Sequence, residues 1–558
     1  MDVTAGDKPE EALSYVIAID EKTDERPPSY KQVNEIALGL PNLNFGETHS
    51  DSLPVSPDQC VAHLKFLAVL EDLRWRVSNK NGIFGIYDSE AERFPASTNE
   101  ALVRIREKRW AVYTARAVER YTKWWFDLLP ISRPQVTMRD LENPEYERSI
   151  IDCDTRILWT ADNVPPLDIL MIWHSHMLHP RDFLEDCIRY GKLSAWSTGF
   201  PFEAVNNCID NRMLEYKPSE ACQQAFERHI KLRWDNLDDS PSKELACPRC
   251  SKPNEVPWTK GGIGHSLKEA FKKNTGIADA SFKTRCNNCR FTINHSRLMV
   301  AKFRQDVSDL LTANHPMPGS ICNIDGIPQG RQNVRNPQYW NNMTFPSRLV
   351  QAVGNDMLIF TDPCGNWCKN IDDLRTQMEV TVRDRNALTA AKGKFQSLSP
   401  GEREHFRRMM SHYWGNTSYF ALDLVGAVIG QGTFIQNMVN IDWLHSPTVM
   451  ETSRRLTKKY KIFIDIKLEN PLKTAVPTMD VGLAWLTHQL QPRKYYKYTT
   501  KGVCRGCRQL IDHDYTPREC NISESFEWTS EMYYRATNGG IYSECSCWYC
   551  EAKRAPGP

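Results

Sequence analysis

Residues 164–183 read VPPLDILMIWHSHMLHPRDF, and residues 476–495 read VPTMDVGLAWLTHQLQPRKY. The second stretch repeats the pattern of the first, so each copy can be tested against the other. A pattern that recurs in this way indicates an internal repeat, and it makes one helical unit the basis of the predicted fold. The matched positions are Val164/Val476, Pro165/Pro477, Asp168/Asp480, Trp173/Trp485, His176/His488, Leu178/Leu490, Pro180/Pro492 and Arg181/Arg493.

Each copy has the start and stop signals of a short helix. Asp168 follows two prolines and is predicted to be an N-cap, and Pro180 ends the helix. Trp173 and His176 are three positions apart and therefore share one face. We expect the imidazole to pack beside the indole while a ring nitrogen bonds a neighbouring helix or the aspartate. The same structural motif in the second copy is Asp480, Trp485 and His488.

Three histidines, His174, His176 and His179, raise the question of a catalytic metal. The second copy has Leu486 and Gln491 in place of the first and third of these, so a three-histidine site is not part of the repeated unit. His174 and His176 are also two positions apart and point to different faces of a helix. The comparison predicts that leucine is tolerated at position 174.

The sequence around the two copies predicts a mainly α fold. Leucines 64, 67, 70 and 73 recur every third residue, and a second helical pattern runs over 101–130. We expect two helical-bundle repeats, each followed by a small cysteine-rich, zinc-ribbon-like β module. The predicted divisions are a flexible arm (1–55), the first repeat (56–200), a zinc-ribbon-like module with a leading helix (201–300), a linker and connecting region (301–400), the second repeat (401–500) and a C-terminal cysteine-rich module (501–551).

Eight of the eighteen cysteines form Cys-x-x-Cys pairs, which favours metal binding over disulfides. Two pairs that come together supply the four thiolates of a closed, structural zinc site. The first predicted zinc site consists of Cys247, Cys250, Cys286 and Cys289.

The second predicted zinc site consists of Cys504, Cys507, Cys547 and Cys550. Its ligand set is left open, because Cys520, Cys545 and His513 lie close enough in the sequence to take part. Neither set leaves an obvious open coordination position, so both predict a structural role for the metal.

Bulk properties exclude several classes of protein. The formal net charge is +1, and basic residues do not alternate with aromatic ones, which argues against nucleic acid as a partner. The acidic start lacks the apolar core of a secretory signal, and the most apolar run is too short to cross a bilayer. We therefore expect a cytoplasmic protein, with a nuclear location as the alternative, and no membrane partner.

Several motifs resemble the glycine-rich domain-containing protein-like family, in particular its fungal branch. They are the two repeat helices, the stretch MMSHYW…ALDLVGAVIGQGTF…DWLHSP, the stretch CPRC…VPWT…CNNCRFTINH, and FEWTSEMYYRATNGGIYSECSCWYC near the end. Together they cover most of residues 56–551. Plant members are named for a glycine-rich tail, and this chain has no glycine-rich tract. The resemblance implies a fold and no established activity.

Three functions follow as expectations. The first is a non-catalytic, zinc-containing interaction or scaffold protein with protein partners. The alternative is a metal-dependent enzyme, such as a non-haem iron enzyme, that uses His174 and His176 with a carboxylate such as Asp168 or Asp186. A further alternative is nucleic-acid binding through the first cysteine module, whose loop carries HSLKEAFKKN.

Overall fold

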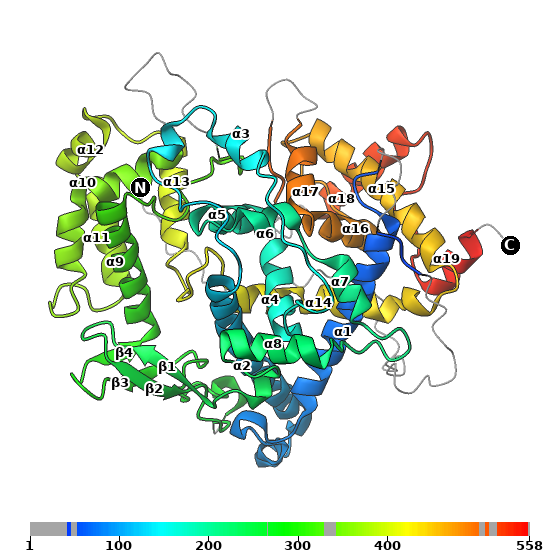
Figure 1. The fold of residues 1–558 in the computed structure, drawn as a ribbon, viewed down its shortest axis with the longest axis horizontal. Coiled ribbons are helices and arrows are strands. Elements are labelled where there is room, and N and C mark those ends of the chain that lie inside the picture. The colour runs from blue at the N-terminus through cyan, green and yellow to red at the C-terminus, as the bar shows by residue number, and fades with distance from the viewer. Residues whose placement is uncertain are drawn as a thin grey trace.

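The computed structural model describes residues 42–45, 53–264, 266–328, 342–501, 508–512 and 522–555. Among them helices predominate, with two small antiparallel strand pairs (Figure 1), so the predicted mainly α class is confirmed. None of the helices described is both long enough and apolar enough to pass through a bilayer.

The first segment is built on one long helix that starts at a strong cap. α1 (Pro57–Asn79) begins with a capping box, in which the Ser56 backbone N–H donates to Gln59 Oε1 and the Ser56 hydroxyl accepts from the first turn. The leucines that recur every third residue are all buried. The other elements of this segment are η1 (Ile83–Gly85), η2 (Asp88–Arg93), α2 (Thr98–Asp127), η3 (Asp140–Glu142), α3 (Tyr146–Ile151), α4 (Leu167–Met177), α5 (Pro180–Arg189), α6 (Leu193–Thr198), α7 (Phe202–Asn207), α8 (Glu220–Ile230) and η4 (Asn236–Asp238).

The repeat helix differs from the prediction in one detail. α4 starts at Leu167, and Asp168 lies inside its first turn, where it accepts a hydrogen bond from Arg120 on α2 instead of capping the helix. Pro180 ends α4 as predicted and also starts α5. The polar groups of Asp168 are therefore used to join two helices.

The first cysteine module consists of two separate hairpins below α9 (Figure 1). β1 pairs with β2 from Ser242/Pro257 to Ala246/Pro253, and β3 pairs with β4 from Lys283/Asn294 to Arg285/Thr292. The elements are β1 (Ser242–Ala246), β2 (Pro253–Pro257), η5 (Leu267–Glu269), β3 (Lys283–Arg285), β4 (Thr292–Asn294) and α9 (His295–Ala313).

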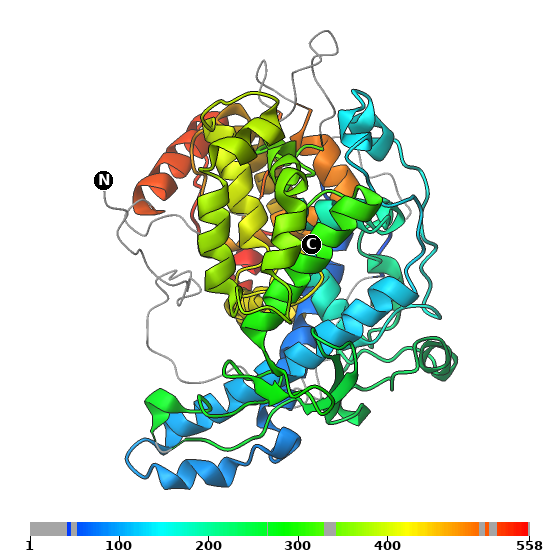
Figure 2. The ribbon, with the colours of Figure 1, turned by 90° about the vertical axis from the view of Figure 1, so that its left-hand side faces the viewer.

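Residues 301–400, expected as a linker and connecting region, are mostly helical where the structure describes them. α11 has a capping box at Asn370 and Asp373, and α12 has an Asp384 cap. The sequence did not predict these short helices, because their capping residues are not part of a repeated pattern. The helices, which face the viewer in Figure 2, are η6 (Asn342–Thr344), α10 (Phe345–Phe360), α11 (Ile371–Thr381), α12 (Arg385–Lys392) and α13 (Pro400–Ser411).

The last segment contains the second copy of the repeat helix as α16. Its C-terminal part was expected to be a β module, but residues 522–555 are described as helices and loops without strands. An amphipathic run from Phe526 to Tyr534 forms a helix there instead. The elements are α14 (Leu424–Ile441), η7 (Trp443–His445), α15 (Val449–Glu469), α16 (Met479–Gln489), α17 (Pro492–Thr499), α18 (Ile522–Ala536) and α19 (Trp548–Arg554).

The two helical segments are interlocked. α1 packs on α2 of its own segment and also on α14, α15 and α16, while α14 packs on α1, α2 and α4. Figure 1 shows α14 beside α4 and α1. A single cluster of buried side chains includes Trp124 and Trp173 from the first segment and Phe463 and Trp485 from the second. The two segments therefore share one core.

Candidate metal centre

The first cysteine module is built from two hairpin turns with the same backbone geometry. The Cys247 N–H donates to Lys252 O (3.0 Å) and the Ser251 N–H donates to Cys247 O (2.9 Å). In the other turn the Cys286 N–H donates to Phe291 O (2.9 Å) and the Arg290 N–H donates to Cys286 O (3.0 Å). The residue after the second cysteine is left-handed in both, with φ of 56° at Ser251 and 59° at Arg290. Each turn thus presents its two sulfur atoms from one tight loop.

The four sulfur atoms of these turns converge on one point. Each lies within 4.8 Å of the others, with 3.7 Å from Cys247 Sγ to Cys289 Sγ and 3.6 Å from Cys250 Sγ to Cys286 Sγ. A disulfide needs sulfur atoms about 2.05 Å apart, so these distances exclude one. A tetrahedral zinc with bonds of about 2.3 Å separates its sulfur ligands by about 3.8 Å. The geometry fits a four-coordinate metal ion.

Backbone N–H donors lower the pKa of two of these thiols, which favours the thiolate form that binds a metal. The N–H groups of Cys289 and Asn288 lower the pKa of the Cys286 thiol to about 6, and the Lys252 N–H lowers the pKa of Cys250. Burial has the opposite effect on Cys247, whose pKa rises to about 12. A cation is therefore needed to hold Cys247 as a thiolate at neutral pH.

A buried asparagine joins the two turns. Asn254 Oδ1 accepts from the Asn287 N–H (2.9 Å), and Asn254 Nδ2 donates to Lys252 O (2.9 Å). The side chain is 3% exposed, so these bonds are shielded from water. Sequence reasoning missed this residue, because only the folded pairing brings position 254 against the second turn.

The module is fixed to the helical body through α2. Lys108 Nζ lies 2.6 Å from the buried Asp279, whose carboxylate also accepts from the Gly276 N–H and the Thr259 hydroxyl. Lys243 pairs with Glu119 at 2.6 Å. A second small apolar cluster joins Trp258 of the module to side chains on and before α2. The cysteine module is therefore part of the same folded body.

The second predicted cysteine site is described in part. Cys545, Cys547 and Cys550 bring their sulfur atoms within 4.8 Å of one another, with 3.4 Å between Cys545 and Cys547. Cys547 is the N-cap residue of α19, and Arg554 donates to Cys545 O (2.6 Å). The structure thus adds Cys545 to the predicted pair. The remaining candidates, Cys504, Cys507, Cys520 and His513, lie outside the described residues.

The histidine of the first repeat helix is fully occupied by polar neighbours. His176 Nε2 donates to Asp186 Oδ2 (3.1 Å) on α5, and Tyr121 OH on α2 donates to His176 Nδ1 (3.0 Å). The ring packs against Trp125, Phe183 and Phe420. The predicted bond to a neighbouring helix is present, while the aspartate partner is Asp186 instead of Asp168, and the indole beside the ring is Trp125 instead of Trp173.

The second repeat helix makes similar contacts. Tyr460 OH on α15 lies 2.9 Å from His488 Nδ1, as Tyr121 does from His176. Lys459 Nζ lies 2.8 Å from the buried Asp480, as Arg120 does from Asp168 at 2.6 Å. Burial alone would raise the pKa of Asp480, but Lys459 outweighs it and the pKa is lowered.

The two tryptophans of the motif differ in their polar contacts. Trp485 Nε1 donates to Tyr495 OH (2.8 Å). Trp173 packs between Trp124 and Trp159, and its Nε1 has no hydrogen-bond partner among the described residues.

His174 points away from His176 and links the two segments. Its Nε2 lies 2.9 Å from His63 Nε2 on α1, and His63 Nδ1 lies 2.8 Å from Thr487 Oγ1 on α16. The Thr487 hydroxyl donates its proton to Leu483 O (2.7 Å), so it accepts from His63 Nδ1–H. His63 Nε2 is then the acceptor for His174 Nε2–H. His174 and His176 therefore do not converge on a common ligand position.

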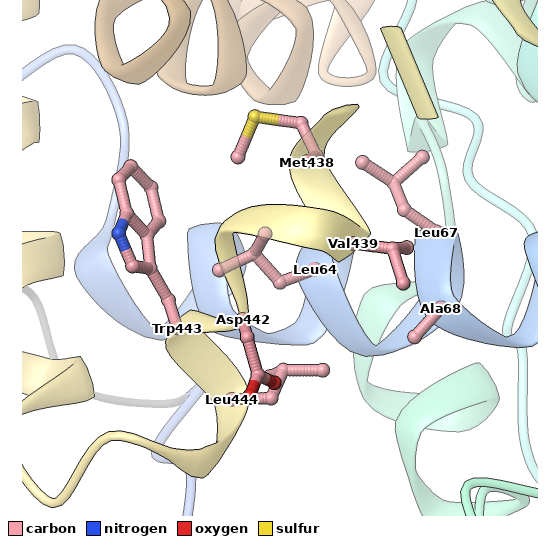
Figure 3. A pocket seen from close by; sticks show the side chains of 8 residues that line it. All are labelled: Leu64, Leu67, Ala68, Met438, Val439, Asp442, Trp443 and Leu444. Carbon is pink, nitrogen blue, oxygen red and sulfur yellow. The ribbon is translucent and has the colours of Figure 1, made fainter. Parts of the chain in front are cut away.

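The small cavity in Figure 3 lies where α1 meets α14 and η7. Asp442 is the one ionisable group among its lining residues, so the cavity offers no set of catalytic side chains. The lining residues are Leu64, Leu67, Ala68, Met438, Val439, Asp442, Trp443 and Leu444.

Residues 379–497 match the profile of the glycine-rich domain-containing protein-like family. The matched range runs through α13, α14, α15 and α16, and it includes the motif of Asp480, Trp485 and His488. The resemblance predicted from the sequence motifs is confirmed over this range. No curated protein and no solved structure matches the chain.

Proposed function

We propose that this protein is a non-catalytic scaffold whose folded body is stiffened by structural zinc and whose surface binds other proteins. The observation that carries the proposal is the set of four convergent sulfur atoms of Cys247, Cys250, Cys286 and Cys289. Four thiolates complete the coordination shell of zinc and leave no position for a substrate or an activated water. The chain therefore supplies a metal site suited to holding two hairpins together.

We further propose that α1–α2–α4–α5 and α14–α15–α16–α17 are copies of one unit. The support is the set of matched contacts, in which Tyr121 and Tyr460 meet the repeat histidines and Arg120 and Lys459 meet the repeat aspartates. In both copies the polar side chains of the motif bind neighbouring helices, which favours a structural role for both.

The metal-enzyme alternative has less support. An iron site of two histidines and one carboxylate needs free ring nitrogens on neighbouring side chains. Both nitrogens of His176 are engaged, by Tyr121 and Asp186, and His174 bonds His63. A metal takes one nitrogen from each ring, so binding to His176 would break one of its two buried hydrogen bonds. His174 Nδ1 has no hydrogen-bond partner among the described residues, but His174 bonds His63 on α1 and does not face a common ligand position with His176.

Exposed aromatic and aliphatic side chains on the C-terminal helices support a role in protein binding. Tyr534 is 58% exposed on α18, Ile541 is 65% exposed in the following loop, and Trp548 and Tyr549 are 48% and 52% exposed on α19. Tyrosine and tryptophan are enriched among residues that dominate the binding energy of protein interfaces. These side chains are our candidates for contacts with a protein partner, and Trp548 and Tyr549 pack against each other.

Elemental analysis of the purified protein tests the proposal. We expect bound zinc and no stoichiometric iron. Cys250→Ser should remove one zinc per chain and expose residues 247–289 to protease, because metal binding contributes to the folding of such modules. The matched control is Cys364→Ser, which alters an exposed cysteine outside both clusters. Full zinc in Cys250→Ser would refute the assignment, and iron that is lost together with activity on dialysis would favour the enzyme.

A further inference from the structure

Positive charge is concentrated in the first cysteine module. Residues 242–297 contain eleven Lys and Arg but four Asp and Glu, an excess of seven, whereas the whole chain has a net charge of +1. The rest of the chain is therefore acidic on balance. The near-zero net charge hides a local basic surface, and a local basic surface is what determines the attraction of a polyanion.

The metal centre gathers part of this charge into one place. Arg249 and Lys252 belong to the first turn, and Arg285 and Arg290 flank the cysteines of the second turn. All four side chains are exposed, and no carboxylate among the described residues forms an ion pair with any of them. Because the four sulfur atoms lie within 4.8 Å of one another, the two turns that carry these cations meet at the metal centre.

An exposed aromatic residue lies on a loop that packs against this basic surface. Arg297 Nε donates to Lys369 O (3.3 Å) and the Ile371 N–H donates to Ser296 Oγ (2.7 Å). At the other end of the loop, the side chains of Arg249 and Cys364 are neighbours. Trp367, between these contacts, is 72% exposed. The loop also adds Lys369, which is exposed.

Two of the nearby carboxylates accept hydrogen bonds from backbone N–H groups. Asp362 Oδ1 accepts from the Cys364 N–H (2.9 Å), and Asp373 Oδ2 accepts from the Lys369 N–H (2.7 Å). Glu244 and Glu255 face each other in the middle of the β1–β2 hairpin, two positions from the Ala246/Pro253 pair at which the turn begins. Glu244 and Glu255 are exposed, and so is Asp372 on the adjoining helix α11.

We propose that Arg249, Lys252, Arg285, Arg290, Lys369 and Trp367 form a binding face for single-stranded nucleic acid. Lys and Arg contact the phosphates, and an exposed indole stacks on an unpaired base. A purely cationic surface would bind single strands and duplexes alike. Stacking on Trp367 requires a base that is not already stacked in a duplex, so the face should prefer single strands. The inference goes beyond the scaffold role and does not depend on it.

Fluorescence anisotropy with labelled oligo(dT) and oligo(U) of about 15 nucleotides tests the proposal, since single-strand sites span about 4–16 nucleotides. The full-length protein should bind both, with an affinity that falls as salt is raised. Lys252→Ala/Arg290→Ala should reduce the slope of log affinity against log salt by about 1.4, at about 0.7 for each lost phosphate contact. The matched control is Arg212→Ala/Lys473→Ala, which removes two exposed cations elsewhere.

Trp367→Ala should weaken binding roughly 5–150-fold, the factor that corresponds to the loss of one stacked base, and Trp367→Phe should retain most of the affinity. Zinc content and thermal melting should match the wild type in these variants. Trp367 is remote in sequence from the four cysteines of the metal centre. Its variants therefore test the proposal even if the double substitution disturbs metal binding.

Three results would overturn the proposal. The first is the absence of saturable binding at about 50 mM salt, where phosphate contacts are strong. The second is duplex DNA that binds as tightly as single strands with no effect of Trp367→Ala. The third is binding to vesicles with anionic phospholipid, sensitive to the same substitutions, without binding to either oligonucleotide.

Discussion

Replacing His174 by leucine tests the hydrogen-bonded link between the two segments. Leu486 at the matched position predicts that leucine is tolerated, but the structure changes this expectation. His174 Nε2–H is the donor to His63 Nε2, and both rings are buried. Without it, the His63 lone pair stays buried and unsatisfied, at a cost of about 1–3 kcal/mol in the free energy of unfolding.

The pH dependence of this loss gives a second, independent number. Burial lowers the pKa of His174 from 6.5 to about 3, so the folded protein holds it neutral. Its contribution to stability is complete above pH 6.5 and is lost as the pH falls below that value, because the unfolded chain then binds a proton that the folded chain does not. At about pH 5.5 this loss amounts to about 1.4 kcal/mol. The leucine variant has no titratable group at position 174 and does not show this loss. The difference in the free energy of unfolding between the wild type and the variant should therefore be smaller at about pH 5.5 than at about pH 7.5, by about 1.4 kcal/mol.

Urea unfolding at about pH 7.5 and pH 5.5, followed by circular dichroism, measures both numbers. His229→Gln, which changes an exposed histidine, is the control and should behave as the wild type at both values. A variant at position 174 that equals the wild type in stability at the higher pH would refute the hydrogen-bond chain. A deficit that is the same at both pH values would refute the neutral, buried state of His174.

Three further substitutions test other parts of the fold by urea unfolding or metal competition. Asp480→Asn should destabilise by about 3–5 kcal/mol and Asp168→Asn by less, because the cation paired with Asp168 also contacts Asp239; equal losses would contradict this account. Ser251→Gly should stabilise the metal module by about 1 kcal/mol, since it relieves a left-handed φ of 56°, and a loss of stability would show that the serine side chain is needed. Asn254→Ala should weaken zinc binding about 10-fold or more in a chelator titration, and unchanged affinity would mean that the bond between the two turns is dispensable.

The sequence predicted the parts of this protein that carry local or repeated signals. The Cys-x-x-Cys spacing identified the sulfurs that converge in the first module, because the turn geometry is set within six residues. The two repeat helices were found because proline and aspartate mark their starts and a second proline marks each end. Buried leucines at every third position identified α1.

Other features could not be predicted because they depend on contacts between distant residues. Asn254 gains its role when it meets Asn287 across the module, and His63 gains its role when α1 meets α16. The basic face was missed for a related reason. Net charge averages over the chain, and Trp367 is 118 positions from Arg249 although the fold places its loop beside that residue.

The interlocking of the two segments has a consequence for how the chain is made. His63 and Thr487, which bond each other, are separated by 424 positions. At about 5–20 residues per second, a ribosome needs about 20–85 s to cover that distance. During this time the surface of α1 that packs on α14, α15 and α16 has no partner. We therefore expect nascent chains of the first segment to need protection by chaperones. Equally, a chain cut between residues 329 and 341 should regain its fold when the two pieces are mixed, whereas neither piece should be stable alone.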